Sequence, residues 1–207
     1  MQDLLPKLSV DVSQPIAAPC ALFADKPGEL WLEIGFGGGE HLAANASQHP
    51  QVGFFGCEPF ENGIAKLLAQ IDENQLGNIR LLKDDAGRLL DALPAASLAR
   101  VYILYPDPWP KRRQRKRRFI SDAMLQRLAR VMQPGAQLRF ATDIDDYAGW
   151  VLQRVLRSPD FVWPVTNARD WLVPWPNWPG TRYEQKALAA GRHPVYLTFT
   201  RDQAAKA

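Results

Sequence analysis

Short apolar runs alternate with helix-like segments along most of this chain, and this alternation restricts the possible folds more than any other feature. The first run, Leu30–Ile34, is followed by the glycine-rich turn Gly35–Gly39 and then by the helix-like segment Glu40–Gln48. A strand, a glycine turn and a helix form the first half of a βαβ unit. Repetition of such units is typical of a parallel sheet with helices on both faces.

The alternation continues beyond the first unit. Apolar spacing predicts strands over Val52–Glu58, Asn78–Lys83, Val101–Tyr105, Gln137–Ala141 and His193–Thr200, and helices over Phe60–Glu73, Arg88–Leu93, Phe119–Met132 and Tyr147–Leu156. We therefore expect a Rossmann-like α/β fold. Because 207 residues fit a single domain, we assign residues 29–207 to it and the proline-punctuated residues 1–28 to an N-terminal arm.

Several classes of protein are excluded by what the sequence lacks. No apolar run approaches the ~18–20 residues that cross a bilayer, and the first residues do not form a signal peptide. Cys20 and Cys57 lie too far apart in sequence for a metal-ligand cluster. Asp143, Asp145 and Asp146 are better explained as acids that open a helix. We expect a cytoplasmic protein with no membrane or metal partner, in which Cys57 is a small buried core residue.

Positive charge is concentrated in one short segment. Seven of the eight residues from Lys111 to Arg118 are cationic, and since the whole chain carries +3, the remaining residues carry −4. The segment follows Tyr105–Trp109, a proline-rich turn that ends a predicted strand and contains Asp107. Ligands of open α/β sheets bind beyond the carboxyl ends of the strands, and dense positive charge favours a polyanionic partner. We predict a small site beside a nucleic-acid backbone; a solvated loop or the start of a helix is the alternative.

The glycine turn 35–39 does not match the dinucleotide fingerprint, because Glu40 stands where the third glycine would lie. Glu58, 19 residues after Gly39, ends the second predicted strand, where an acid binds ribose hydroxyls in nucleotide-binding folds. Glu33 places a further negative charge just before the turn. This combination suits a ligand with a ribose and a positive charge; a tight turn without a ligand is the alternative.

The glycine turn and Glu58 together resemble a known family. Glu33-Ile-Gly35-Phe-Gly37-Gly-Gly39 is similar to the first motif of class I S-adenosylmethionine-dependent methyltransferases. The resemblance implies S-adenosylmethionine as cofactor and a seven-stranded, mostly parallel sheet whose last strand is inserted antiparallel. It also implies that an acid after the third strand contacts the adenine end of the cofactor. Asp85 matches that position, and the adjacent Asp84 could instead cap the next helix.

Three further stretches narrow the resemblance. They are Pro106-Asp107-Pro108-Trp109-Pro110-Lys111 with its basic continuation, Ala141-Thr142-Asp143, and Thr181-Arg182-Tyr183-Glu184. Together they resemble the bacterial tRNA (guanine-N7)-methyltransferase family, over about residues 30–199. The resemblance implies methyl transfer to guanine N7 of a variable-loop nucleotide in tRNA.

The resemblance also implies a role for each matching residue. Asp107 would be catalytic; the cofactor would contact Glu33, Gly35, Gly37, Gly39, Glu58, Asp85 and Asp107; the guanosine would contact Lys111, Asp143, Thr181, Arg182, Tyr183 and Glu184; and the RNA would contact Arg113, Gln114, Arg115, Lys116, Arg117 and Arg118. Family members usually carry a longer N-terminal extension. We therefore expect either a lower RNA affinity here or a larger share of it in the basic segment.

These residue types suit the chemistry. Guanine N7 has an available lone pair and no proton, so its attack on a sulfonium methyl group requires no general base. Asp107 is therefore expected to accept hydrogen bonds from the N1–H and N2–H edge and to offset the positive charge that develops on the ring. The sequence leaves open whether the protein is a monomer or a homodimer.

Tryptophan and proline dominate residues 161–180, where Trp163, Trp171, Trp175 and Trp178 lie. These rings could form a platform on which bases stack. We favour the other interpretation, an irregular connection between the last two strands that is packed by its own aromatic residues.

The sequence leaves two alternative functions to be considered. Amino-group methyltransferases use an Asn/Asp-Pro-Pro-aromatic turn, from which Asp107-Pro108-Trp109 departs by one residue. A catalytically silent RNA-binding module would not need the glycine turn, Glu33 and Glu58 together.

Overall fold

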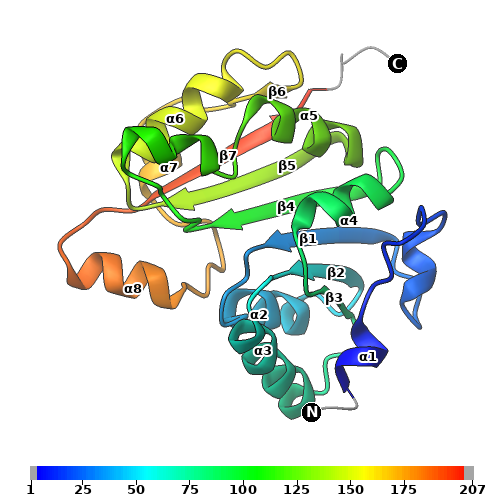
Figure 1. Ribbon diagram of the computed structural model, residues 1–207. Helices are drawn as coiled ribbons and strands as arrows, with labels where there is room; N and C mark the ends of the chain where they lie inside the picture. The colour runs from blue at the N-terminus through cyan, green and yellow to red at the C-terminus, as the bar shows by residue number, and fades with distance from the viewer. Residues whose placement is uncertain (1–3, 203–207) are drawn as a thin grey trace.

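The computed structural model describes residues 4–202, which build one seven-stranded sheet of order β3-β2-β1-β4-β5-β7-β6 (Figure 1). The strands are β1 (Glu29–Ile34), β2 (Val52–Cys57), β3 (Ile79–Leu82), β4 (Leu98–Leu104), β5 (Met132–Thr142), β6 (Phe161–Val162) and β7 (Val195–Arg201). The first five strands pair in parallel, whereas β7 is inserted antiparallel between β5 and β6. The predicted fold class is confirmed.

The register brings the carboxyl ends of the parallel strands to one edge of the sheet. Ile34, the last residue of β1, lies opposite Cys57 of β2 and Ile103 of β4, and Cys57 lies opposite Leu82 of β3. The segments that follow these strands therefore meet beyond the same edge. The strand order reverses between β1 and β4, which is the position where α/β sheets bind ligands.

Helices cover both faces of the sheet. On one face lie α2 (Glu40–Gln48) and α3 (Glu61–Asn74), and on the other lie α4 (Ala86–Ala92), α5 (Asp122–Val131) and α6 (Asp145–Val155) (Figure 1). Alternate residues of β1 enter two separate cores: Leu30 and Leu32 pack with α4, α5 and α6, while Trp31 packs with α2 and α3. Over residues 4–202, none of the helices has both the length and the apolar character needed to cross a membrane.

The N-terminal residues run along the edge of the sheet beside β3. They form α1 (Leu4–Leu8) and the 3-10 helix η1 (Pro19–Leu22). The N–H of Val10 donates to the carbonyl of Leu81 over 2.9 Å, and that of Ile16 donates to Ala92 over 2.8 Å. The arm therefore occupies hydrogen-bonding groups of an otherwise open edge strand. Its division from the domain at residue 28 stays a prediction.

Several elements differ from the sequence prediction. The strand β6 was missed because its two residues are too few for a periodic pattern. Both α7 (Arg169–Leu172) and α8 (Arg182–Ala189) were also missed. The predicted helix over 119–132 begins only at Asp122, because the side chain of Ser121 accepts the N–H of Met124 and caps the helix there.

The Trp/Pro-rich connection between β6 and β7 is packed against the sheet. Trp175 is buried, its ring lies 5.5 Å from that of Tyr196, and its indole N–H donates to the hydroxyl of Thr198 over 2.8 Å. Trp163 and Trp171 contact each other edge to face. The favoured prediction is confirmed for the aromatic packing, whereas the predicted irregular course is wrong at Arg169–Leu172, which form α7.

Candidate active site

A cavity of about 450 Å³ lies beyond the carboxyl ends of β1, β2 and β4. Its volume is typical of small-molecule sites. The lining combines residues from distant parts of the chain, including the predicted site residues Gly35, Gly37, Glu58, Asp85, Asp107, Arg182 and Tyr183. The fold therefore brings most of the proposed cofactor residues and part of the proposed guanosine site into one space.

The glycines of the first turn serve two different purposes. Gly35 lines the cavity with φ +70°, and the position where a side chain would begin faces open space. Gly39 lies outside the lining, at the N-terminus of α2 with φ +80°, where a Cβ atom would approach Leu67 of α3 to 2.8 Å. Gly35 thus leaves room for a ligand, whereas Gly39 allows α2 and α3 to pack closely.

Glu58 is held in place by the backbone around it. One carboxylate oxygen accepts the N–H of Gly37 over 2.8 Å, and the other accepts the N–H of Phe60 over 3.1 Å. The side chain is buried yet lines the cavity. Each oxygen keeps an acceptor site for a ligand hydroxyl, so the carboxylate is oriented before any ligand arrives.

Two residues next to Glu58 were not identified from the sequence. Phe60 is 71% exposed at the cavity, where its ring offers an apolar surface to a ligand. Gly63, in the first turn of α3, also lines the cavity, and a Cβ atom there would lie 2.3 Å from the carbonyl oxygen of Gly37. A lone glycine inside a helical pattern was the available signal for Gly63.

Glu33 does not line the cavity. Its carboxylate faces α2 and accepts a hydrogen bond from Nδ1 of His41 over 2.6 Å. The amide of Asn45 lies 3.0 Å from Nε2 of the same imidazole, and all three side chains are buried. Glu33 was predicted to contact the cofactor, but the structure places it behind the glycine turn, where it anchors α2 to β1.

The two adjacent acids after β3 have distinct contacts. Asp85, not Asp84, caps α4: its carboxylate accepts the N–H of Gly87 over 2.8 Å. Asp84 forms an ion pair with Arg88 one helical turn on. Both acids line the cavity. Asp85 therefore has both the capping role and the predicted cofactor role. Its second carboxylate oxygen does not take part in the capping hydrogen bond.

The turn that carries Asp107 has an unusual backbone. Tyr105 and Trp109 have φ angles of 49° and 42°, although neither is glycine, and each precedes a proline. The guanidinium of Arg117 lies 3.9 Å from the centre of the Trp109 ring. Such strained residues persist where the surrounding structure imposes them, and they are concentrated at functional sites. Asp107 itself is exposed and lines the cavity.

The segment Thr181–Glu184 is a capping box that begins α8. The hydroxyl of Thr181 accepts the N–H of Glu184, whose carboxylate accepts the N–H of Thr181 in return. The carboxylate of Glu184 is buried and also accepts hydrogen bonds from Trp178 and Tyr196. Arg182 and Tyr183, by contrast, line the cavity. Glu184, predicted to bind guanosine, is instead occupied by protein partners and positions the start of α8.

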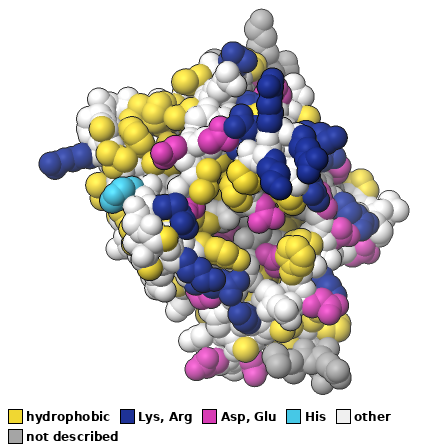
Figure 2. Space-filling model, turned by 60° about the vertical axis from the view of Figure 1, so that its left-hand side comes forward, with side chains coloured by type: hydrophobic (Ala, Val, Ile, Leu, Met, Phe, Trp, Pro, Cys, Tyr) yellow, Lys and Arg dark blue, Asp and Glu magenta, His cyan; other side chains and the backbone are white. Residues whose placement is uncertain are grey.

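Cationic side chains lie in two groups on one face of the molecule, with hydrophobic and acidic atoms between them (Figure 2). Most of the basic segment forms a 3-10 helix, η2 (Arg112–Arg117), whose residues Arg113, Lys116 and Arg117 are exposed. Lys186 and Arg192, in α8 and just after it, are exposed as well. Arg117 also lines the cavity, so part of this positive charge is available to a polyanion close to it.

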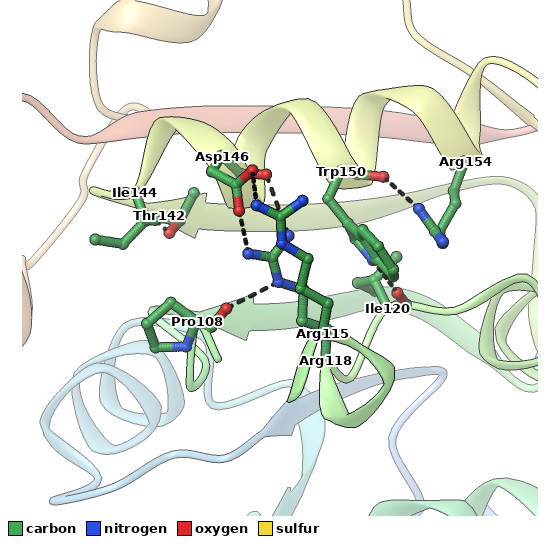
Figure 3. A network of polar contacts seen from close by, with 9 residues as sticks. All are labelled: Pro108, Arg115, Arg118, Ile120, Thr142, Ile144, Asp146, Trp150 and Arg154. Atoms are coloured by element: carbon green, nitrogen blue, oxygen red, sulfur yellow. Dashed lines mark hydrogen bonds and ion pairs between the residues drawn. The ribbon is translucent and has the colours of Figure 1, made fainter. Parts of the chain in front are cut away.

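Three residues that were predicted to contact RNA or guanosine lie outside the cavity lining. Arg118 was predicted to bind RNA, but its side chain is fully buried and pairs with Asp146 of α6 (Figure 3). Asp143 pairs with Arg192 over 2.5 Å. Lys111 is exposed at the start of η2 and does not line the cavity. The burial of Arg118 removes it from the surface that RNA could reach, which corrects that prediction.

Cys57 also lines the cavity, at the end of β2, and is 1% exposed. Burial, together with the negative charges of Asp85, Asp84 and Glu58, raises the pKa of its thiol well above the ordinary value. The thiol therefore stays protonated at neutral pH, which is unsuited to a nucleophile. The prediction of a small buried core residue is confirmed.

The fold recurs in solved structures that are described as methyltransferases. The sequence model of a family described as "Putative methyltransferase" matches residues 27–197. The 16S rRNA methyltransferase KamB has a TM-score of 0.64 at 17% identity, with 92% of this chain and 95% of that chain covered. SMU.1697c from Streptococcus mutans, solved in complex with SAH, has a TM-score of 0.56 at 10% identity, with 84% and 89% covered. The fold and the family match define a class I methyltransferase.

Relatives with much higher identity specify the family. A tRNA (guanine-N(7)-)-methyltransferase of Nitrobacter hamburgensis is 51% identical over 204 residues, which cover 98% of this chain and 80% of the relative. The protein of the same name from Agrobacterium fabrum is 52% identical over 202 residues, with 97% and 87% covered. The chain belongs to the tRNA (guanine-N(7)-)-methyltransferase family.

Proposed function

We propose that the protein transfers the methyl group of S-adenosylmethionine to N7 of a variable-loop guanosine in tRNA, in the cytoplasm. The observation that carries this proposal is the shared cavity, in which the glycine turn and Glu58 meet Asp107. Family membership supplies the substrate class, since the relatives are named for this reaction. The exposed cations beside the cavity are consistent with a nucleic-acid substrate.

The cavity suits the proposed cofactor. Gly35 leaves open space at the turn, and the carboxylate of Glu58 is already oriented to accept hydrogen bonds from ribose hydroxyls. Asp85 offers a further acceptor and Phe60 an apolar face for the adenine end. When bound, S-adenosylmethionine supplies an electrophilic methyl group on a positively charged sulfur. Glu33 and Gly39 lie outside the cavity lining, and we propose that they support the turn and do not contact the cofactor.

The reacting guanine would lie between the turn after β4 and the start of α8. Asp107 lies in that turn as an exposed carboxylate that can accept from the N1–H and N2–H edge and offset the positive charge that builds up on the ring. Arg182 and Tyr183 line the same cavity from α8. Lys111, Asp143 and Thr181 lie outside the cavity lining; from the family motifs alone we propose that they also contact the guanosine. No group has to remove a proton, so positioning and electrostatics provide the catalysis.

The RNA backbone would contact the exposed part of the basic segment. We propose Arg113, Gln114, Arg115, Lys116 and Arg117 for this role and leave Arg118 out, because its side chain is not exposed. Such contacts are independent of sequence and weaken as salt is added. They would hold the tRNA while the guanosine site selects the target.

The test is incubation of purified protein with methyl-labelled S-adenosylmethionine and unmodified tRNA, followed by nucleoside analysis of the digest. Label in 7-methylguanosine is expected. A tRNA whose variable-loop guanosine is replaced by adenosine is the matched substrate control and should receive no label. Label in an amino-methylated nucleoside would contradict the proposal, as would unlabelled RNA from a protein that binds the cofactor.

A further inference from the structure

Arg118 differs from the other cations of the basic segment. Its side chain has an exposed fraction of 0%, whereas Arg113, Lys116 and Arg117 are exposed. A buried guanidinium loses its hydration, so it is tolerated only where protein groups satisfy its charge and its N–H donors. The contacts of Arg118 therefore indicate what the residue does.

These contacts join the Asp107 turn to helix α6 (Figure 3). Nε of Arg118 donates to the carbonyl oxygen of Pro108 over 2.8 Å, directly after Asp107. The two terminal nitrogens bind Asp146, one at its backbone carbonyl over 3.2 Å and the other at its carboxylate. The rings of Tyr147 and Trp150, also in α6, lie 4.9 and 5.0 Å from the guanidinium.

The turn depends on such external support. Pro106, Pro108 and Pro110 have no N–H groups, so the turn can form few backbone hydrogen bonds of its own. Its positive φ angles at Tyr105 and Trp109 also require the surroundings to hold them. A planar guanidinium with five fixed donors can bind a carbonyl and a carboxylate at once, which a lysine ammonium cannot reproduce.

We propose that Arg118 and Asp146 are positioning residues, which hold the Pro108 carbonyl and thereby fix the carboxylate of Asp107 against the reacting guanine. The inference rests on the proposed function. Arg115, whose side chain is 36% exposed, shares the carboxylate of Asp146 over 2.8 Å and stays within reach of RNA. The basic segment is therefore divided into a surface part that binds RNA and a buried residue that supports the catalytic turn.

The experiment compares Arg118→Lys and Asp146→Asn with Arg127→Lys. Arg127 of α5 forms an exposed ion pair with Asp91 of α4 and does not line the cavity, so Arg127→Lys provides the same chemical change outside the lining. The protein is labelled with 5-fluorotryptophan, and the fluorine resonances of Trp109 and Trp150 are assigned by Trp→Phe replacement. Turnover at saturating cofactor and tRNA, KM for tRNA, and the salt dependence of tRNA binding are measured on each variant.

Arg118→Lys should shift or broaden the Trp109 resonance and lower kcat by about 10- to 100-fold, the scale expected when a reacting group is displaced by about 1 Å. Its salt slope for tRNA binding should equal that of the wild type. Asp146→Asn should also lower kcat while binding tRNA at least as tightly, because it removes a negative charge. Arg127→Lys should match the wild type in every measurement.

Two results would overturn the inference: an unchanged Trp109 resonance with unchanged kcat in both variants, or a reduced salt slope in Arg118→Lys with kcat intact. If Arg118→Lys does not fold, as judged by thermal melting, the Asp146→Asn variant provides the test of the inference. This variant retains every cation of the basic segment. The fluorine readout needs no substrate. A wild type that forms no 7-methylguanosine would therefore refute the proposed function, while the resonances would still decide whether Arg118 holds the turn.

Discussion

The two walls of the cavity are built in different ways. We call the residues after β1, β2 and β3 (Gly35, Gly37, Glu58 and Asp85) the cofactor wall, and those after β4 and at the start of α8 (Asp107, Trp109, Arg182 and Tyr183) the transfer wall. Backbone N–H groups fix the carboxylates of the cofactor wall. Side-chain contacts fix the transfer wall: Arg118, bound to Asp146 of α6, donates to the Pro108 carbonyl at the turn, and Glu184 at the start of α8 accepts from Trp178 and from Tyr196 of β7.

This difference implies that the two walls have separate functions, cofactor binding and methyl transfer. A wall fixed by its own backbone is complete whenever the sheet is folded, so it can bind a cofactor without RNA. A wall fixed by side chains is sensitive to single replacements some distance away, and its damage should appear in the rate of transfer. Binding of the cofactor and turnover should therefore respond to different residues.

The largest expected effect is on the transfer wall. Asp107→Ala should lower kcat by roughly 10²–10³-fold, because it removes the group proposed to offset charge in the transition state. The dissociation constant for S-adenosylmethionine should change little. Single-turnover methylation and calorimetry on the same preparation measure the two quantities. Equal losses in both would assign Asp107 to the cofactor wall and contradict the separation of the two walls.

The next effect concerns the surface beside the transfer wall. Neutralising Arg113, Arg115, Lys116 and Arg117 together should weaken tRNA binding about equally across tRNA sequences. The salt dependence of the binding constant should flatten by ~0.7–0.9 for each phosphate that the variant no longer neutralises. Filter binding at several salt concentrations provides the slope. A slope equal to that of the wild type would show that the segment does not contact RNA.

A smaller effect is expected on the cofactor wall. Glu58→Ala should raise the dissociation constant for S-adenosylmethionine about 10-fold, the equivalent of one hydrogen bond to a charged acceptor. The rate at saturating cofactor should fall much less. Calorimetric titration checks the affinity, with Glu61→Ala, an exposed acid of α3, as the matched control. An unchanged affinity in Glu58→Ala would exclude the ribose-binding role.

The smallest effect is on acid stability. The hydrogen bond from Arg118, aided by the charges of Arg118 and Arg115, lowers the pKa of Asp146 below its ordinary value. A carboxyl whose folded-state pKa is depressed stabilises the fold above its unfolded pKa of about 3.9 and loses that contribution as the pH falls through the folded value. Melting temperatures of Asp146→Asn should therefore lie below those of the wild type at pH 7 and approach them below about pH 4. A constant difference would contradict the pairing.

The sequence was sufficient for the parts of the site that depend on local backbone. The strand, the glycine turn and the acid at the end of β2 are encoded within residues 29–58, and the spacing of Glu58 from the turn predicts that the two meet. The position of Asp107 at the carboxyl end of β4 follows from the apolar run that ends before it. To predict these features, it is enough to know that neighbouring strands of the sheet are parallel.

The sequence alone does not predict the role of a residue where that role depends on contacts with side chains distant in the chain. Arg118 looks like its cationic neighbours, and only the approach of Asp146, 28 residues later, shows that it is buried. Glu33 and Glu184 are also acids in motifs, but His41, Trp178 and Tyr196 occupy their carboxylates. The capping-box spacing of Thr181 and Glu184 was the one local signal that could have revealed the latter role.

The separation of the two walls can be measured most directly by hydrogen exchange, first with S-adenosylhomocysteine alone and then with unmodified tRNA added. We expect S-adenosylhomocysteine alone to protect residues 35–39 and 84–87, whereas protection of residues 111–117 and 181–186 should require tRNA. Equal protection of all four segments by S-adenosylhomocysteine alone, or no protection of 111–117 by tRNA, would contradict the division of the cavity into a cofactor wall and a transfer wall.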